Sequence, residues 1–245
     1  MIKAKHSNFA DFIFKPYIYN LLKKNFFSIN IIGDIPKVDD YIPLILAPNH
    51  STWWDGFFVY LINKELYKRR FYIMILEEQL SKYNFFTKLG GFSINKLNPK
   101  EIIRSLDYIS DEMKMYKNSI ITIFPQGELL PNFVRPISIN KGIHKLVNIH
   151  QSELQILPLA IKVEFLKEEK PTVFFKFSNL YKSEKYNSEM MLDLQTELEE
   201  CLNNIEQSIL SLDFGHELLL GKKSVSEKSK KAFAPINKVK RGFDK

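Results

Sequence analysis

The stretch that decides the fold is "YIPLILAPNHSTWWDG", residues 41–56. Residues 41–47 form a short, nearly unbroken apolar run that ends at Pro48. A run of this length is typical of a strand buried on both faces of a parallel sheet. The polar residues after it end the strand, and the apolar segment that follows predicts a helix over about 54–66. A strand that passes directly into a helix is the repeating unit of an α/β sheet, so this stretch predicts that fold class.

The same alternation continues toward the carboxyl end of the chain. The further strands that we predict are 71–76, 90–94, 119–124, 154–165 and 172–181. The further helices are one that ends near 89, then 99–116, 141–150 and a long amphipathic helix over about 191–212. We therefore predict an α/β fold: a single layered domain with a largely parallel sheet flanked by helices.

Residues 8–27, "NFADFIFKPYIYNLLKKNFF", precede this domain. Pro16 is predicted to divide them into an N-terminal pair of short helices, because proline is tolerated in a first helical turn and not in a helix interior. Apolar and aromatic faces edged with lysine are typical of a helix in a membrane interface. A helical hairpin packed on its own domain fits the pattern equally well. We assign 1–30 to an N-terminal helical membrane-interface segment and 31–220 to the α/β domain.

Composition narrows the class of protein. With 245 residues, of which 45% are hydrophobic, the chain is long enough for one sizeable domain and too apolar to be disordered throughout. No apolar run reaches the roughly 18 residues that a membrane-spanning helix needs. We see no secretory signal, so we expect a protein of the cytoplasm.

Cysteine and histidine give no sign of a metal site. The single cysteine, Cys201, excludes an internal disulfide and a cysteine zinc cluster, and packing within a late helix is its expected role. His144 and His150 are six residues apart on a predicted helix, so they do not face together as metal ligands would.

The net charge of +7 is concentrated near the end of the chain. Residues 222–245 contain nine lysines and arginines against two acidic residues, so residues 1–221 are formally neutral. We predict that 221–245 form a mobile basic tail. Such a tail is attracted to an anionic membrane surface, and a tail that only increases solubility is the alternative.

Two polar motifs follow two of the predicted strands. His50 lies just past the strand 41–47, and "PQGE" (125–128) lies just past the strand 119–124. Ligands of open α/β sheets bind outside the carboxyl ends of the strands. Both motifs are therefore predicted to line one site.

His50 and Asp55 are residue types that serve as a base and its orienting acid. A neutral histidine can take the proton of a bound hydroxyl, and Asp55, one turn into the next helix, can hold the other imidazole nitrogen. With no protein nucleophile in the motif, the substrate hydroxyl itself would attack, which indicates direct acyl transfer. Gly127 has no side chain, so its N–H can approach a developing oxyanion. Trp53 and Trp54 are expected to be core or interface residues.

Four short blocks occur in order between about residues 40 and 165. They are "NHSTWWD" (49–55), "GGFSINK" (90–96), "FPQGE" (124–128) and "ILPLAIK" (156–162). The first resembles the NHxxxxD signature of the glycerolipid acyltransferases, the family of bacterial 1-acylglycerol-3-phosphate acyltransferase. The third resembles that family's FPEGT block, and the other two resemble its intervening block and its later proline-containing block. A single block would be weak evidence, whereas four in the family's order are strong.

The resemblance implies an O-acyltransferase, with 31–220 as the acyltransferase domain. His50 would be the general base and Asp55 its orienter. The donor would be acyl-CoA or acyl-ACP and the acceptor a hydroxyl of a lipid-like molecule, with no metal and no other cofactor. Together with the basic tail and the N-terminal segment, it leads us to expect a peripheral protein at the cytoplasmic face of a membrane, in contact with an anionic membrane surface and with no nucleic-acid partner. The substrate-binding positions that it indicates are Asn49, Ser51, Lys96, Phe124, Pro125, Gln126, Gly127, Glu128 and Arg135.

The chain departs from the family's pattern where the family binds phosphate. Leu129 stands where the family usually has an arginine. Gln126 replaces the glutamate of the FPEGT block, and Glu128 replaces its threonine. Asn95 and Lys96 replace the aspartate–arginine pair of the intervening block.

These departures leave the acceptor open. A leucine cannot make the bidentate phosphate contact of an arginine, and a nearby glutamate repels phosphate. If the acceptor is lysophosphatidic acid, Lys96, Arg135 or Lys141 is expected to compensate; a non-phosphate lipid or a glycolipid is the alternative. Two rival functions are a lipid-binding, membrane-associated protein that has lost the reaction and a thioesterase that uses water.

Overall fold

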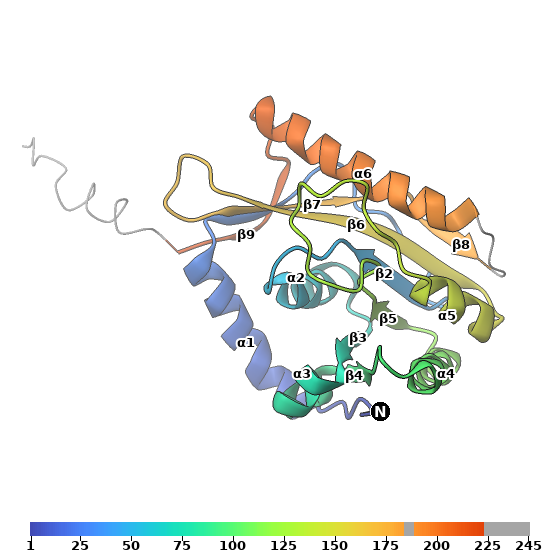
Figure 1. Ribbon diagram of the computed structural model, residues 1–245. Coiled ribbons are helices and arrows are strands. Elements are labelled where there is room, and N and C mark those ends of the chain that lie inside the picture. Colours follow the sequence, from blue (N-terminus) through green and yellow to red (C-terminus); the bar gives the residue numbers. More distant parts are fainter. Residues whose placement is uncertain (184–188, 223–245) are drawn as a thin grey trace, which may run out of the picture.

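The computed structural model describes residues 1–183 and 189–222 of the chain (Figure 1). In this part of the chain nine strands form one sheet. The strands are β1 (Ser28–Ile31), β2 (Leu44–Pro48), β3 (Arg70–Leu76), β4 (Gly91–Ile94), β5 (Ser119–Thr122), β6 (Leu154–Glu164), β7 (Thr172–Phe177), β8 (Tyr181–Ser183) and β9 (His216–Leu220). The helices are α1 (Asn8–Asn25), α2 (Asp55–Ile62), η1 (Asn63–Tyr67), α3 (Glu77–Lys82), η2 (Asn84–Leu89), α4 (Pro99–Met115), α5 (Gly142–His150) and α6 (Glu189–Leu210).

The strand order across the sheet is β4-β3-β5-β2-β6-β7-β1-β9, and β8 also pairs with β6. The first five strands in this order are parallel to their neighbours. β1 and β7 are also parallel, whereas the pairs β6–β7, β6–β8 and β1–β9 are antiparallel. The predicted α/β class with a largely parallel sheet is thus confirmed.

Some elements differ from the prediction. β1, "SINI", and β9, "HELLL", were not expected, since each is short and neither carries a long apolar run. The helix predicted to end near 89 is divided at Tyr83, whose backbone leaves the helical region, into α3 and a 3₁₀ helix, η2. The strand predicted over 172–181 ends at Phe177, before β8 begins.

Alternate residues of the central strand β2 point into two hydrophobic cores. Leu44 and Leu46 pack with residues of α1 and α2, whereas Ile45 and Ala47 pack with residues of α4, α5 and α6. α1 and α2 accordingly lie on one face of the sheet and α4, α5 and α6 on the other (Figure 1). Both faces of β2 are covered, which explains its unbroken apolar sequence. Cys201 is buried in α6, as predicted.

The predicted pair of N-terminal helices is wrong, because α1 is a single helix with Pro16 in its interior. Four residues at intervals of four are buried on one face of this helix: Ala10, Phe14, Ile18 and Leu22. They lie on both sides of the proline along the chain. Their packing holds the helix together and offsets the roughly 3 kcal/mol that an interior proline costs.

α1 and the sheet form one unit. The boundary predicted at residue 30 falls inside β1, and the buried face of α1 belongs to the core of the sheet. The opposite face of α1 is open to solvent, with Phe9 72% and Phe12 77% exposed. No helix among the described residues is long and apolar enough to span a membrane. The predicted basic tail lies outside the described residues from 223 onward.

Candidate active site

The carboxyl ends of β2 and β5 bring the two polar motifs together. These strands are parallel neighbours, with Leu46 opposite Thr122, so the chain leaves both at the same edge of the sheet. The His50 N–H donates to the side-chain oxygen of Gln126 over 2.6 Å. The Leu130 N–H donates to the His50 carbonyl over 2.9 Å. The structure therefore places the segment after β5 directly against His50.

His50 and Asp55 form a hydrogen-bonded pair. The His50 Nδ1 lies 2.8 Å from Asp55 Oδ2. Asp55 is fully buried and accepts three more hydrogen bonds, from the Ser51 N–H (2.8 Å), the Thr52 N–H (2.9 Å) and the Thr52 hydroxyl (2.6 Å). It is also the first residue of α2, where the helix dipole favours a negative charge. These contacts hold the carboxylate in one orientation against the imidazole.

The second imidazole nitrogen of His50 is available to a substrate. Because the carboxylate faces Nδ1, we infer that Nδ1 carries the hydrogen and that Nε2 has the free lone pair. No partner of Nε2 is found within residues 1–183 and 189–222, and the side chain is 22% exposed. The ring of Phe124 stacks on the imidazole, with centroids 4.0 Å apart and planes 21° apart. Phe124, expected to bind substrate, thus fixes the plane of the imidazole.

Residues 124–128 form a tight turn whose shape requires glycine. Gly127 has a φ of +71°, in the left-handed region that favours glycine. A Cβ at this position would lie 2.7 Å from the side-chain nitrogen of Asn140, which itself donates to the Gln126 carbonyl over 2.6 Å. The Gly127 N–H donates to the Phe124 carbonyl over 3.0 Å. The expected use of this N–H for an oxyanion therefore does not hold in this structure, because the turn itself uses the donor.

Gln126 connects the turn to the histidine. Its side chain is buried, and its oxygen accepts the His50 N–H. Because the His50 backbone N–H needs an acceptor, the amide oxygen of Gln126 must face it. The Gln126 side-chain nitrogen, Nε2, therefore remains free to donate. In the part of the chain that the structure describes, no group accepts a hydrogen bond from this nitrogen. Gln126 thus offers a neutral donor close to His50, where the family's glutamate would place a carboxylate.

Asn49 positions other groups and does not face a substrate. Its side-chain oxygen accepts the Ile161 N–H over 2.6 Å. Its side-chain nitrogen donates to the Ile161 carbonyl and to the side-chain oxygen of Asn132, both over 3.0 Å. The residue is buried, and the protein itself uses its polar atoms. The substrate-binding role expected for Asn49 is therefore replaced by that of a clamp between β2, β6 and the loop around Asn132.

The three cations expected to compensate for the missing arginine lie in different surroundings. The Lys96 ammonium donates to the Gly127 carbonyl, which places it at the turn. The Arg135 guanidinium donates to two carbonyls of residues 132–134, over 2.6 and 3.0 Å, so it closes its own loop. Lys141 is exposed just before α5. Lys96 is therefore the cation of these three that the structure brings to the turn.

Three other predicted positions complete the surroundings of the pair. Glu128 and Leu129 are exposed at the end of the turn, so this edge presents an acid and an apolar side chain. The Ser51 hydroxyl is buried with no hydrogen-bond partner among the described residues. A buried donor of this kind calls for a partner, which a bound ligand can supply. Within the described residues, no group of three His, Cys, Asp or Glu side chains is placed to hold a metal ion.

Three positioning residues were missed by the sequence analysis. Thr52 bonds Asp55 through both its amide and its hydroxyl. The spacing of Thr52 and Asp55 is that of a capping box, in which the fourth residue accepts the N–H of the first, so this contact could have been anticipated. Asn132 supports Asn49, and the Asn140 N–H donates to the carbonyl of the buried Pro125 over 2.8 Å. Both asparagines come from the irregular segment between β5 and α5, which carries no periodic signal.

The two tryptophans of the motif have different surroundings. Trp54 packs edge-on against Phe26, with ring centroids 5.0 Å apart, beside the core of α1 and α2. Trp53 is 67% exposed and contacts Phe57 at 4.9 Å. Trp54 therefore matches the expected core role, whereas Trp53 presents an aromatic surface next to the site.

Comparisons with known proteins concern the fold and the family of the chain. The crystal structure of the 1-acyl-sn-glycerophosphate (LPA) acyltransferase PlsC from Thermotoga maritima is similar, with a TM-score of 0.52 over 81% of this chain and 80% of that chain. At 18% sequence identity this likeness shows a shared fold. No curated protein matches the chain by sequence. The sequence profile of the acyltransferase family matches residues 28–162, which include both polar motifs and are 135 of the 245 residues. Since the match spans more than half of its length, the chain belongs to the acyltransferase family.

Proposed function

We propose that the protein transfers a fatty acyl group from the thioester of acyl-CoA or acyl-ACP to a hydroxyl of a lipid-like acceptor. The observation that carries this proposal is the His50–Asp55 pair, with its 2.8 Å hydrogen bond and an available Nε2 at the carboxyl edge of the sheet. Membership of the acyltransferase family supports the type of reaction. The pair supplies a base and an orienting acid without a protein nucleophile, so the acceptor itself attacks.

The reaction follows from the position of the free nitrogen. The His50 Nε2 takes the proton of the acceptor hydroxyl while that oxygen attacks the thioester carbonyl carbon. Asp55 stabilises the imidazolium that forms, without accepting its proton. The tetrahedral intermediate then collapses: the C–S bond breaks, and the leaving thiolate takes the proton from the imidazolium. An ester and a free thiol result, and His50 returns to its neutral form.

The negative charge that develops on the carbonyl oxygen needs donors. The Gly127 N–H is used within its turn, so we assign this role to two side chains beside His50. The first is the Gln126 side chain, whose oxygen is fixed by the His50 N–H and whose Nε2 can donate. The second is the Ser51 hydroxyl, which is buried without a partner among the described residues. Donors that are already in place stabilise such a charge without reorganisation.

The acceptor is the least determined part of the proposal. The structurally similar Thermotoga maritima protein is named for 1-acyl-sn-glycerophosphate, which makes lysophosphatidic acid the first acceptor to test. In this chain Lys96 would meet the phosphate, because its ammonium lies at the Gly127 carbonyl. Leu129 and the acidic Glu128 favour an acceptor without a phosphate, such as a neutral lyso-lipid or a glycolipid.

We further propose that the protein works as a peripheral protein at the cytoplasmic face of a membrane. An acceptor with a long acyl chain is found in the bilayer, so its hydroxyl must be reached from the interface. The exposed Phe9 and Phe12 of α1 and the exposed Trp53 beside the site offer apolar contacts for that surface.

The proposed function is tested by measuring thiol release with long-chain acyl-CoA and acyl-ACP. The acceptors are lysophosphatidic acid, a lyso-lipid without the phosphate and a glycolipid, and mass spectrometry identifies the ester. We expect turnover that is abolished in His50→Ala and kept in the matched variant His150→Gln, which alters a histidine outside the site.

The outcomes separate the alternatives. Turnover on lysophosphatidic acid would show that other residues replace the missing arginine, and turnover only on the other acceptors would indicate that Leu129 and Glu128 mark a changed specificity. Release of free fatty acid without any ester would identify a thioesterase. Thiol release that is equal in the parent protein and His50→Ala would contradict the mechanism.

A further inference from the structure

The solvent-exposed face of α1 changes character along the helix. Its first turns expose the apolar and aromatic side chains Phe9, Phe12 and Ile13. From Lys15 onward it presents mostly lysines and polar residues, namely Lys15, Tyr19, Asn20, Lys23 and Lys24, with the exposed Tyr17 among them. Two surfaces with different chemistry thus adjoin each other on one helix.

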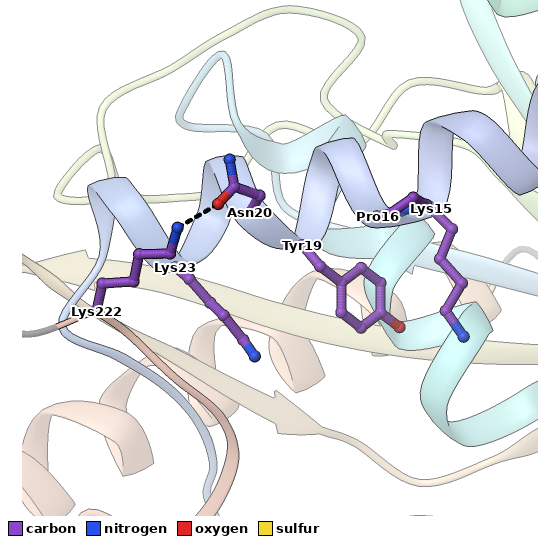
Figure 2. A pocket seen from close by; sticks show the side chains of 6 residues that line it. All are labelled: Lys15, Pro16, Tyr19, Asn20, Lys23 and Lys222. Carbon is purple, nitrogen blue, oxygen red and sulfur yellow. Dashed lines mark hydrogen bonds between the residues drawn. The ribbon is translucent and has the colours of Figure 1, made fainter.

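A groove of about 480 Å³ runs along the second half of α1 (Figure 2). It is lined by Lys15, Pro16, Tyr19, Asn20, Lys23 and Lys222. Lys222 enters from the segment after β9, and its N–H donates to the Lys23 carbonyl over 2.7 Å. Its ammonium donates to the Asn20 side-chain oxygen, as Figure 2 shows. The groove therefore combines residues of α1 with Lys222, which is the last described residue of the chain.

The charge of this groove is positive and only partly neutralised. None of the six lining residues is acidic. Glu65 lies beside the groove, accepts a hydrogen bond from the Tyr19 hydroxyl and is 4.0 Å from the Lys15 ammonium. Lys23 and Lys222 pair with no carboxylate within residues 1–183 and 189–222. Two lysines thus remain to meet an anion.

The groove also provides an apolar lining. The ring of Pro16, the ring of Tyr19 and the aliphatic stems of Lys15 and Lys23 lie along it (Figure 2). Lysine stems of this kind cover apolar surface while the ammonium groups remain in water. A ligand that joins a phosphate to apolar groups therefore matches both the charge and the lining.

This groove is separate from the site of His50. It borders Glu65 in η1, which continues α2 beyond its carboxyl end, whereas Asp55 is the first residue of α2. Ten residues at the rise of a helix separate these two acids by about 15 Å. A lysophospholipid whose hydroxyl is at His50 cannot place its own phosphate in the groove, so the groove would hold a second molecule.

We propose that the groove binds the phosphate of an anionic phospholipid in the membrane surface. This inference rests on the proposed work of the protein at a membrane and adds a specific headgroup site to it. With α1 tilted in the interface, its aromatic first turns reach the acyl region while the lysines nearer its carboxyl end stay at the depth of the phosphates. The bound lipid would fix the orientation of the helix and, through the shared core of α1 and α2, that of the active site.

The test measures the binding of the full chain to vesicles by flotation. Vesicles of phosphatidylcholine alone are compared with vesicles that also contain phosphatidylglycerol. We expect the double variant Lys23→Gln/Lys222→Gln to bind the anionic vesicles about 25-fold more weakly, since each lysine at a membrane surface contributes about fivefold. The matched control Lys114→Gln/Lys145→Gln removes the same charge from α4 and α5, across the sheet, and is expected to bind like the parent protein.

Three results of the vesicle assay would overturn the proposal. The first is parental binding of the groove variant, and the second is an equal loss in the control variant, which would indicate net charge alone. The third is a failure of the charge-keeping variant Lys23→Arg/Lys222→Arg to retain binding. Inorganic phosphate is tested separately by calorimetry; binding that depends on Lys23 and Lys222 without any effect on vesicles would make this a site for a soluble anion and also overturn it.

Binding and catalysis are measured apart, so the two proposals can fail independently. The variant His50→Ala is expected to be inactive and yet to bind anionic vesicles as the parent protein does. A chain without acyltransferase activity whose vesicle binding depends on Lys23 and Lys222 would keep the groove and lose the proposed function. An active chain whose vesicle binding does not depend on these lysines would keep the proposed function and lose the groove.

Discussion

Two histidines of this chain have opposite surroundings. His50 lies at the carboxyl edge of the sheet, with a carboxylate at Nδ1, a ring stacked on one face and Nε2 available. His150 ends α5 in the other core, fully buried, with the Ser110 hydroxyl 3.2 Å from its Nδ1 and no partner for Nε2 among the described residues. The proposed role as a base therefore rests, for His50, on an orienting acid and on access to substrate, and burial alone gives His150 neither.

The largest expected effect comes from removing the base. In His50→Gln, transfer should fall on the order of 10⁴-fold, since the proposed general base is removed. The urea midpoint should stay close to that of the parent, because glutamine keeps a donor for the Asp55 carboxylate. Steady-state rates and unfolding curves measured on the same preparations check both expectations. A loss of less than tenfold would show that His50 is not the base.

The next effect comes from changing the acid and keeping its shape. In Asp55→Asn the amide oxygen keeps the place of Oδ2, because the Ser51 and Thr52 N–H groups donate there, so Nδ1 keeps its hydrogen but the negative charge that stabilises the imidazolium is lost. We expect kcat to fall on the order of 10³-fold with little change in KM. If KM rises instead and kcat is kept, Asp55 acts on substrate binding and not on the orientation of His50.

The buried histidine should affect stability and not turnover. Burial, with Lys114 and Lys117 nearby, lowers the pKa of His150 to about 4. Between pH 6.5 and 4 the unfolded chain binds a proton at this residue and the folded chain does not, so stability rises with pH across this window. We expect His150 to account for a loss of about 3 kcal/mol when the pH falls from 7 to 4.

The variant His150→Gln isolates this contribution, because glutamine stays neutral over the whole range and can still bond Ser110. Urea unfolding at several pH values should give a flatter pH dependence for the variant than for the parent protein. Identical slopes would show that His150 is not the group responsible.

The smallest expected effect concerns the neutral donor beside the base. In Gln126→Glu the carboxylate can still accept the His50 N–H, but the proposed donor to the carbonyl oxygen is lost. We expect kcat to fall about tenfold, because one of the two proposed donors to the oxyanion is lost and the other, the Ser51 hydroxyl, remains. Gln126→Leu should fall at least as far, since it also leaves the His50 N–H without its acceptor. Full activity of Gln126→Glu would limit Gln126 to positioning His50.

The sequence was most informative where the signal is local. The apolar run of β2, the cap and proline that begin α4, and the spacing of His50 and Asp55 each lie within a few residues, so their structures could be predicted. The interior Pro16 was misjudged because distant packing holds α1 together. β1 and β9 were missed for a similar reason, since their pairing partners are far away in the chain.

The supporting residues of the site were the hardest to predict. Asn49 was expected to face substrate, and only its bonds to Ile161, 112 residues later, show that it is a clamp. Asn140 shapes the turn at Gly127 from a segment without secondary structure. Roles of this kind depend on which segments meet after folding, and no pattern in a single sequence records them.

The clamp formed by Asn49 also has a consequence for folding during synthesis. His50 and Asp55 leave the ribosome early, but the backbone that holds Asn49 belongs to β6, and Ile161 is made more than a hundred residues later. During synthesis this clamp therefore cannot form until α2 to α5 and then β6 have been made. A nascent chain that stops before Ile161 would carry every residue of the signature and still lack the clamp that positions it.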